Sequence, residues 1–219
     1  MTEPADTPVT GLGDPNWLRW AKALRSLAQA GLTYSESPFD RDRYSQVQAI
    51  AAEMVALQAG IDRAEAHRCF ADAVGYETPK VDVRGVVFRD GRILLVQELL
   101  DSGRWTLPGG WADVNDRPSE AVEREVWEES GYRVRATKVL AIYDRRLHGH
   151  TPPHPWGVYK LFFRCDLVGG APATSVETAG ATFFAEDAIP ELSLARTTPE
   201  EIARLFEHQR HPDWPADFD

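Results

Sequence analysis

Carboxylates crowd one short segment of this sequence. Glu125, Glu128 and Glu129 lie three and one positions apart. At about 100° per residue they share roughly one third of the circumference of an α-helix. Like charges at this spacing repel, so the pattern by itself gains the helix nothing. A hard divalent cation such as Mg²⁺ prefers oxygen ligands and would turn the repulsion into binding. A solvated acidic face is the alternative, since most charge runs lie in water.

Three features beside these glutamates favour the metal interpretation. Gly110 follows another glycine ahead of the segment, where backbone carbonyls can turn towards a metal. Arg124 lies next to Glu125 and one turn before Glu128, so its guanidinium can orient a carboxylate. Gly131 stands where a helix ends in a left-handed residue. The segment therefore predicts a helix that holds a hard cation.

The segment 110–132 resembles the Nudix box, Gly-x5-Glu-x7-Arg-Glu-U-x-Glu-Glu-x-Gly-U, in which U is a bulky apolar residue. Asp116 stands where that family has Glu, which puts the role of this first acid in doubt. Asp116 is alternatively the N-cap of the helix. Eight of the nine defined positions match, namely Gly110, Arg124, Glu125, Val126, Glu128, Glu129, Gly131 and Tyr132.

The resemblance implies a metal-dependent pyrophosphohydrolase. Mg²⁺, with Mn²⁺ as a substitute, would be held by three box glutamates and a backbone carbonyl, while the arginine orients them. Those residues are Glu125, Glu128, Glu129, the Gly110 carbonyl and Arg124. The general base is either a box glutamate or an acid of a later loop, for which Glu177 is the best candidate. A solvated loop acid is the alternative for Glu177.

Segments outside the box indicate the substrate class. The stretches 28–44, 143–150 and 192–196 look like those of a Nudix subfamily that hydrolyses nucleoside diphosphates linked to another group. Its members include CDP-choline and ADP-ribose pyrophosphatases. The candidate substrate-binding residues are Arg104, Asp144, Arg145 and His148. The histidines of segment 148–154 also permit a zinc site, although the carboxylate-rich box favours a harder cation.

The elements that must position these residues follow from periodicity and turn signals. Helical spacing predicts helices over 15–31, 40–60, 62–73 and 199–208, the last capped by Thr198. Strands are expected over 81–88, 93–98, 132–144, 158–167 and 181–185. We expect a disordered N-terminus (1–13), a small all-helical domain (14–77) and a catalytic domain (78–219). The fold class is α+β, and the resemblance implies an α/β/α sandwich for the catalytic domain.

The length and composition of the sequence limit the classes of protein to which it can belong. The chain has 219 residues, long enough for one large or two small domains. No apolar run approaches the length of a membrane span, and the N-terminus lacks the pattern of a signal peptide. The net charge of −10 argues against bulk capture of nucleic acid or of an anionic membrane. The two cysteines, in different predicted domains, fit a reducing cytoplasm.

The expected partners are a small nucleotide substrate and a second copy of the chain. Trp17 and Trp20, three apart in the first helix, are either core residues or part of a dimer interface. Two other functions compete with hydrolysis of a linked nucleoside diphosphate. One is a catalytically silent nucleotide-binding module, which would usually lack a box glutamate. The other is an enzyme that processes RNA ends, which would favour a basic channel.

Overall fold

The computed structural model describes residues 14–59, 62, 64, 66, 76, 78–113 and 115–219. The chain divides into two compact units. One comprises Lys80–Pro152 and Val158–Asp219, and the other the described part of residues 13–79 with Pro153–Gly157. Within the described residues, no helix is both long and apolar enough to cross a membrane.

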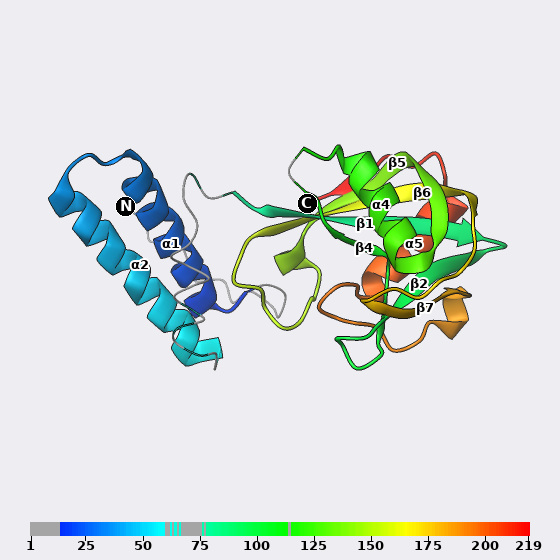
Figure 1. Ribbon diagram of the computed structural model, residues 1–219, viewed down its shortest axis with the longest axis horizontal. Coiled ribbons are helices and arrows are strands. Elements are labelled where there is room, and N and C mark those ends of the chain that lie inside the picture. The colour runs from blue at the N-terminus through cyan, green and yellow to red at the C-terminus, as the bar shows by residue number, and fades with distance from the viewer. Residues whose placement is uncertain are drawn as a thin grey trace, which may run out of the picture. The chain divides into compact units, whose positions relative to one another are not determined.

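The helical unit contains helices α1 (Asn16–Tyr34) and α2 (Pro38–Ala59), drawn in blue and cyan in Figure 1. The expected end of the first helix at Gly31 is wrong. A Cβ at Gly31 would lie 2.4 Å from the ring of Tyr44, so this glycine permits close packing of α2 on α1 inside a continuous helix. The helix predicted over 62–73 lies largely outside the described residues. The small core is formed by Leu18, Ala21, Ala51, Ala52 and Val55.

Eight strands of the described chain form one mixed sheet (Figure 1). The hydrogen-bonded order is β3-β2-β1-β6-β5-β8, while β4 pairs with β1 and β7 with β2. The strands are β1 (Lys80–Arg89), β2 (Arg92–Glu98), β3 (Trp105–Thr106), β4 (Gly109–Trp111), β5 (Tyr132–Asp144), β6 (Val158–Gly170), β7 (Thr178–Phe184) and β8 (Asp217–Phe218).

A helix covers each face of this sheet. Helix α4 (Pro118–Ser130) packs Val122 and Val126 into a core with Val83 of β1. Helix α5 (Pro199–Arg210) packs Ile202 and Phe206 into a separate core. These two cores confirm the expected α/β/α sandwich. Two short 3-10 helices, η1 (Arg145–Leu147) and η2 (Glu186–Ala188), lie in the connections.

Strand register brings distant segments to the end of α4. In the antiparallel pair of β1 and β4, Arg84 lies opposite Gly109 and Val83 opposite Gly110. In the pair of β2 and β7, Glu98 lies opposite Thr178. The sheet therefore places the glycines that precede the acidic helix, a glutamate of β2 and the loop before β7 around one region.

Candidate metal and phosphate site

Helix α4 begins after the Asp116 position and ends at a glycine. Arg117 is the N-cap residue, Pro118 starts the first turn, and the Arg117 amide donates to the Glu120 carboxylate. The alternative in which Asp116 caps the helix is therefore wrong. Gly131 closes the helix with φ 74°, as predicted, and its amide donates to the Trp127 carbonyl. The three box glutamates lie in the last two turns between these ends.

The guanidinium of Arg124 donates hydrogen bonds to several carboxylates. Its Nη1 donates to Glu125 Oε1 at 2.8 Å and to Glu128 Oε2 at 3.1 Å. Its Nη2 donates to Asp116 Oδ2 at 3.2 Å and to Asp113 Oδ2 at 3.3 Å. Arg124 thus holds the carboxylates of Glu125 and Glu128 in place. It also binds the carboxylate of Asp116, whose side chain is shorter than that of Glu.

Glu129 is the most deeply buried box glutamate, with 6% of its surface exposed. Its Oε2 accepts a hydrogen bond from the Gly109 amide at 2.8 Å, and its backbone carbonyl accepts one from the Thr178 hydroxyl. Burial raises the pKa of Glu129 to about 8, against opposition from Arg84 and the Gly109 amide, and the charges of Glu98 and Glu125 add to the rise. Several acids therefore share one poorly solvated region.

The two glycines ahead of the helix allow a close backbone approach. Gly109 has φ 148°, and a Cβ there would lie 2.0 Å from the Val83 carbonyl oxygen. A Cβ at Gly110 would lie 2.9 Å from Glu125 Oε2. Only glycines fit these positions without movement of the neighbours.

Glu98, at the end of β2, belongs to the same region, although the sequence did not single it out. It is 4% exposed, and burial raises its pKa against the charges of Arg196 and Arg84. The Leu99 amide donates to the Glu177 carbonyl at 2.9 Å, so the loop that carries Glu177 lies against the end of β2. The Glu177 side chain itself is exposed. A charged residue at the end of an apolar strand was the available signal for Glu98.

A buried ion cluster supports the strands beneath these acids. Arg84 donates to both oxygens of Asp82, from Nε at 2.7 Å and from Nη2 at 3.1 Å. The fully buried Lys160 donates to Asp82 Oδ2 at 3.0 Å. Burial would raise the pKa of Asp82, but the two cations outweigh it and lower the pKa to about 2. Arg84 also donates to the Leu107 carbonyl, which ties the cluster to the segment that leads to Gly109.

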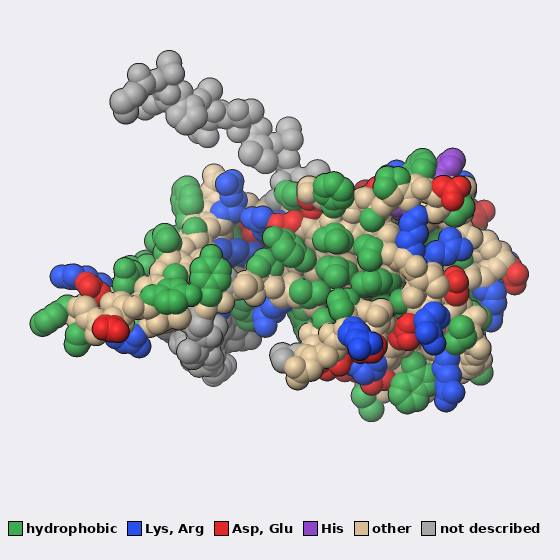
Figure 2. Space-filling view, turned by 90° about the horizontal axis from the view of Figure 1, so that it is seen from above, with side chains coloured by type: hydrophobic (Ala, Val, Ile, Leu, Met, Phe, Trp, Pro, Cys, Tyr) green, Lys and Arg blue, Asp and Glu red, His purple; other side chains and the backbone are tan. Residues whose placement is uncertain are grey.

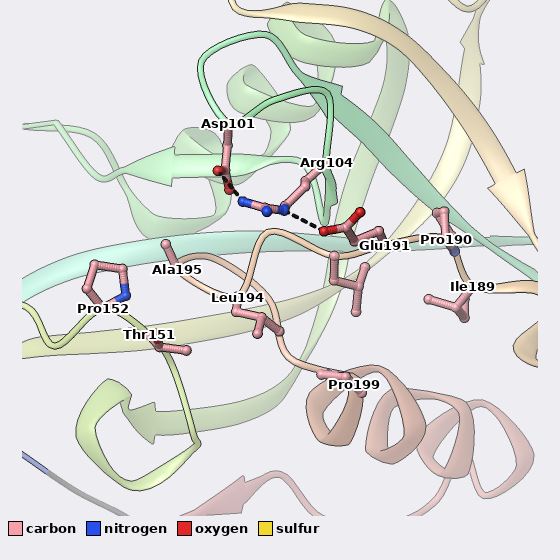
Figure 3. Close-up of a pocket in the computed structure, with 11 residues that line it drawn as sticks. Asp101, Arg104, Thr151, Pro152, Ile189, Pro190, Glu191, Leu194, Ala195 and Pro199 are labelled. Carbon is pink, nitrogen blue, oxygen red and sulfur yellow. Dashed lines mark hydrogen bonds and ion pairs between the residues drawn. The ribbon is translucent and has the colours of Figure 1, made fainter.

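Arg104 lies at the rim of a cavity and not among the box glutamates. Its Nε donates to Glu191 Oε1 at 2.8 Å and its Nη1 to Asp101 Oδ1 at 3.0 Å. Figure 3 shows this guanidinium between the two carboxylates, above the apolar side chains of Leu194 and Pro199.

The other predicted substrate residues have partners within the fold. Asp144 accepts from the Arg146 amide and guanidinium at 3.0 Å. The buried Arg145 donates to the carbonyls of Pro152 and Ala195, two residues that line the cavity. His148 bonds Asp219 at 2.9 Å and stacks on Tyr143. Arg145 therefore supports the cavity wall by binding the backbone carbonyls of two residues that line it.

The zinc alternative gains no support in the part of the chain that the structure describes. The buried His150 bonds Glu201 Oε1 at 2.8 Å through Nε2 and the Leu194 carbonyl through Nδ1. Among the described residues, no three His, Cys, Asp or Glu side chains are arranged to hold a metal ion. In the box, Arg124 donates to both Glu125 and Glu128.

The donor chemistry of the box nevertheless fits a hard cation. All of its side-chain donors are carboxylate oxygens, the kind of ligand that Mg²⁺ and Mn²⁺ take. Burial raises the pKa of Glu125 as well as that of Glu129, and neighbouring carboxylates add to both rises, so repulsion among these acids disfavours their ionised forms. A cation at these oxygens would offset that repulsion, provided that Arg124 gives up its bonds to Glu125 or Glu128.

Comparison with sequence families gives two matches that follow each other along the chain. Residues 15–70 match a family described as a UDP-X-like, N-terminal oligomerisation domain. Residues 78–208 match the NUDIX domain.

Individual relatives extend the likeness over most of the chain. YjhB of Bacillus subtilis, whose name proposes ADP-ribose pyrophosphatase activity, is 42% identical over 93% of this chain and 97% of its own. The crystal structure of an ADP-ribose pyrophosphatase from Streptococcus suis is 40% identical, with a TM-score of 0.59 over 65% of this chain and all of that one. The crystal structure of a UDP-X diphosphatase is 28% identical, with a TM-score of 0.59 over 93% of this chain and 98% of that one.

Proposed function

This chain belongs to the Nudix hydrolase family and is a pyrophosphohydrolase, and we propose that it cleaves nucleoside diphosphates linked to another moiety. The products are a nucleoside monophosphate and the phosphorylated moiety, with ADP-ribose and CDP-choline as the two substrate types. The observation that carries the proposal is the carboxylate cluster of Glu125, Glu128 and Glu129 around Arg124. The relatives named for ADP-ribose and UDP-X hydrolysis support the substrate class.

We propose Mg²⁺, with Mn²⁺ as a substitute, as the cofactor of this cluster, because Nudix hydrolases generally use divalent metals. The proposed ligands are the Gly110 carbonyl and the carboxylates of Glu125, Glu128 and Glu129. When bound, such a cation neutralises phosphate oxygens and lowers the pKa of a water molecule. Arg124 orients the carboxylates, as its contacts with Glu125 and Glu128 suggest.

The proposed reaction breaks one bond of the anhydride. A water oxygen attacks one phosphorus, the bond from that phosphorus to the bridging oxygen breaks, and the leaving phosphate keeps the bridging oxygen. The water proton passes to a carboxylate base. Two candidates remain for the base, a box glutamate and Glu177, whose loop lies against Glu98.

Arg104, Asp144, Arg145 and His148 stay as proposed substrate residues. Arg104 borders the cavity directly. Arg145 acts through the carbonyls that it holds in the cavity wall. Asp144 and His148 would act by fixing the η1 connection.

We further propose that the chain forms a homodimer through residues 14–77 and that residues 78–219 form the catalytic domain. The oligomerisation domain matched at 15–70 supports a multimer. The expected cytoplasmic location stays a prediction.

A product-resolved hydrolysis panel tests the reaction. It comprises ADP-ribose, CDP-choline, NADH, dinucleoside polyphosphates and deoxynucleoside triphosphates, each with Mg²⁺ and with Mn²⁺. We expect ADP-ribose and CDP-choline to yield a nucleoside monophosphate at higher rates than the other compounds are hydrolysed. Preferential release of pyrophosphate from triphosphates would contradict the proposed substrate class.

The box glutamates provide the first testable substitutions. Glu128→Gln and Glu129→Gln should each lower kcat by about 100-fold or more, because each removes a charge from the proposed metal site. Both should keep the fold, as measured by circular dichroism. Glu120→Gln, an exposed acid of the same helix, is the matched control and should keep the wild-type rate. Near-wild-type rates in Mg²⁺ for both box variants would refute the metal assignment.

A further inference from the structure

The cavity beside Arg104 has the size and walls of a ligand site. It lies within the catalytic unit and has a volume of about 610 Å³, within the range of small-molecule sites. Apolar side chains form most of its wall, among them Ile189, Leu194 and Pro199. Its rim carries Asp101 and Glu191, which have no role in the proposed hydrolysis, and the proposed substrate residue Arg104.

One arginine links this cavity to the acid cluster. Arg196 Nε lies 3.1 Å from Glu98 Oε1, and its Nη1 lies 4.0 Å from Asp101 Oδ2. Glu98 in turn lies opposite Thr178 in the pair of β2 and β7, and the Thr178 hydroxyl donates to the Glu129 carbonyl. A guanidinium therefore stands between the buried carboxylates and the cavity rim, where it can meet a phosphate.

The backbone limits the distance between the two regions. Gly109 follows Arg104 by five residues along the chain, so their Cα atoms lie at most about 18 Å apart. The Thr197 hydroxyl accepts a hydrogen bond from the Leu107 amide and shares one with the Thr106 hydroxyl, so it holds the intervening segment at both residues. A molecule with a diphosphate at the glutamates can thus place an attached group at the cavity.

The rim chemistry distinguishes between kinds of attached group. Asp101 and Glu191 are hydrogen-bond acceptors that Arg104 holds in position (Figure 3), and hydroxyl groups donate to such carboxylates. A quaternary ammonium is typically held by the faces of aromatic rings. None of the described residues that line the cavity is aromatic.

We propose that this cavity binds the moiety attached to the diphosphate and that it selects a hydroxyl-bearing sugar over a quaternary ammonium group. Asp101 and Glu191 accept hydrogen bonds from the sugar hydroxyls, and the apolar walls cover the ring. The inference rests on the proposed function, whose substrate class it narrows.

CDP-glucose and CDP-choline test this selection, because the two substrates share the nucleotide and differ only in the attached group. With Mg²⁺ and the full chain, we expect kcat/KM for CDP-glucose to exceed that for CDP-choline by about 10-fold or more. Asp101→Asn and Glu191→Gln should each lower this ratio by about 5-fold or more, since each weakens an acceptor for the hydroxyls. Glu207→Gln changes a partly exposed acid of α5 outside the cavity and should leave the ratio unchanged.

The outcomes separate the two proposals. If neither CDP compound nor ADP-ribose is hydrolysed, the proposed function is wrong. If they are hydrolysed but choline is preferred, or both cavity variants keep the wild-type ratio, the cavity does not select a sugar and the inference is overturned. Because Glu191 is largely exposed, its substitution keeps the test valid even if Asp101→Asn fails to fold.

Discussion

Burial raises the pKa of Glu98, Glu125 and Glu129, three acids from two elements. Grouping such side chains costs free energy in the protein without a cation, because each ionised form is poorly solvated and near another negative charge. Arg124, Arg84 and Arg196 offset part of this cost. A residue set that is unfavourable for stability alone is the usual mark of a site shaped by function.

The Gly110→Ala substitution tests whether the close approach of the Glu125 carboxylate to Gly110 matters for activity. The added Cβ would lie 2.9 Å from Glu125 Oε2, so the carboxylate must move away from the proposed metal site. We expect kcat with saturating Mg²⁺ to fall by about 10-fold or more, with little loss of thermal stability, because the end of a flexible side chain can yield.

Gly180→Ala is the matched control, since a Cβ there meets nothing within 4 Å. It should leave both rate and melting temperature unchanged. A Gly110→Ala enzyme with the wild-type rate would show that the position of Glu125 does not matter for turnover.

The sequence predicted the box residues because they lie close together in the chain and repeat at helical spacing. It did not reveal Glu98 or Lys160, whose partners lie on other elements, nor Arg84, whose partner Asp82 lies two residues away on the same strand. Asp82 and Lys160 meet only because β1 and β6 pair in parallel with these two residues in register. A charged residue within an apolar strand indicates that a partner exists but does not identify it.

At the scale of elements, α4 is positioned by one close contact with the sheet. A Cβ at Gly85 of β1 would lie 2.3 Å from Cγ2 of Val126. The helix can therefore lie this close to the strand only while position 85 is glycine, and the placement of Glu125 and Glu129 depends on it.

Gly85→Ala should displace α4. We expect a loss of about 1–3 kcal/mol in the free energy of unfolding, as for other overpacked cores, together with a lower kcat. Val126→Ala removes the clashing methyl groups, so the double variant should be more stable than the two single effects added together, as measured by urea unfolding. Simple additivity of the two substitutions would contradict this contact.

Element boundaries were predictable where local signals are strong. The strand 132–144 and the Thr198 cap are confirmed, because a helix-ending glycine and a capping threonine mark them. The strand expected over 181–185 instead spans Thr178–Phe184, since pairing with β2 extends it at its start. Such pairing depends on a strand about eighty residues earlier in the chain, which local periodicity does not report.

For the whole molecule, a net charge of −10 repels a polyphosphate at long range. The arginines near the site offer local attraction, yet Arg84, Arg104, Arg124 and Arg196 are each already paired with carboxylates. A divalent cation is therefore the simplest source of the positive charge that an anionic substrate needs, which agrees with the family's general use of such metals.

The helical unit supports the last prediction, which concerns assembly. Several large apolar side chains on α1 and α2 are exposed, including Trp20, Leu27 and Leu57, whereas Trp17 packs against the small core. Figure 2 shows hydrophobic side chains along this unit, at the left. Burial of such a surface by a second copy would stabilise a dimer.

We expect the wild-type chain to be dimeric by light scattering, and Leu27→Glu combined with Leu57→Glu to shift it towards monomer. Val168→Glu, an exposed apolar position of β6, should stay dimeric. A monomeric wild type, or a dimer unaffected by the paired substitutions, would exclude this surface as the interface.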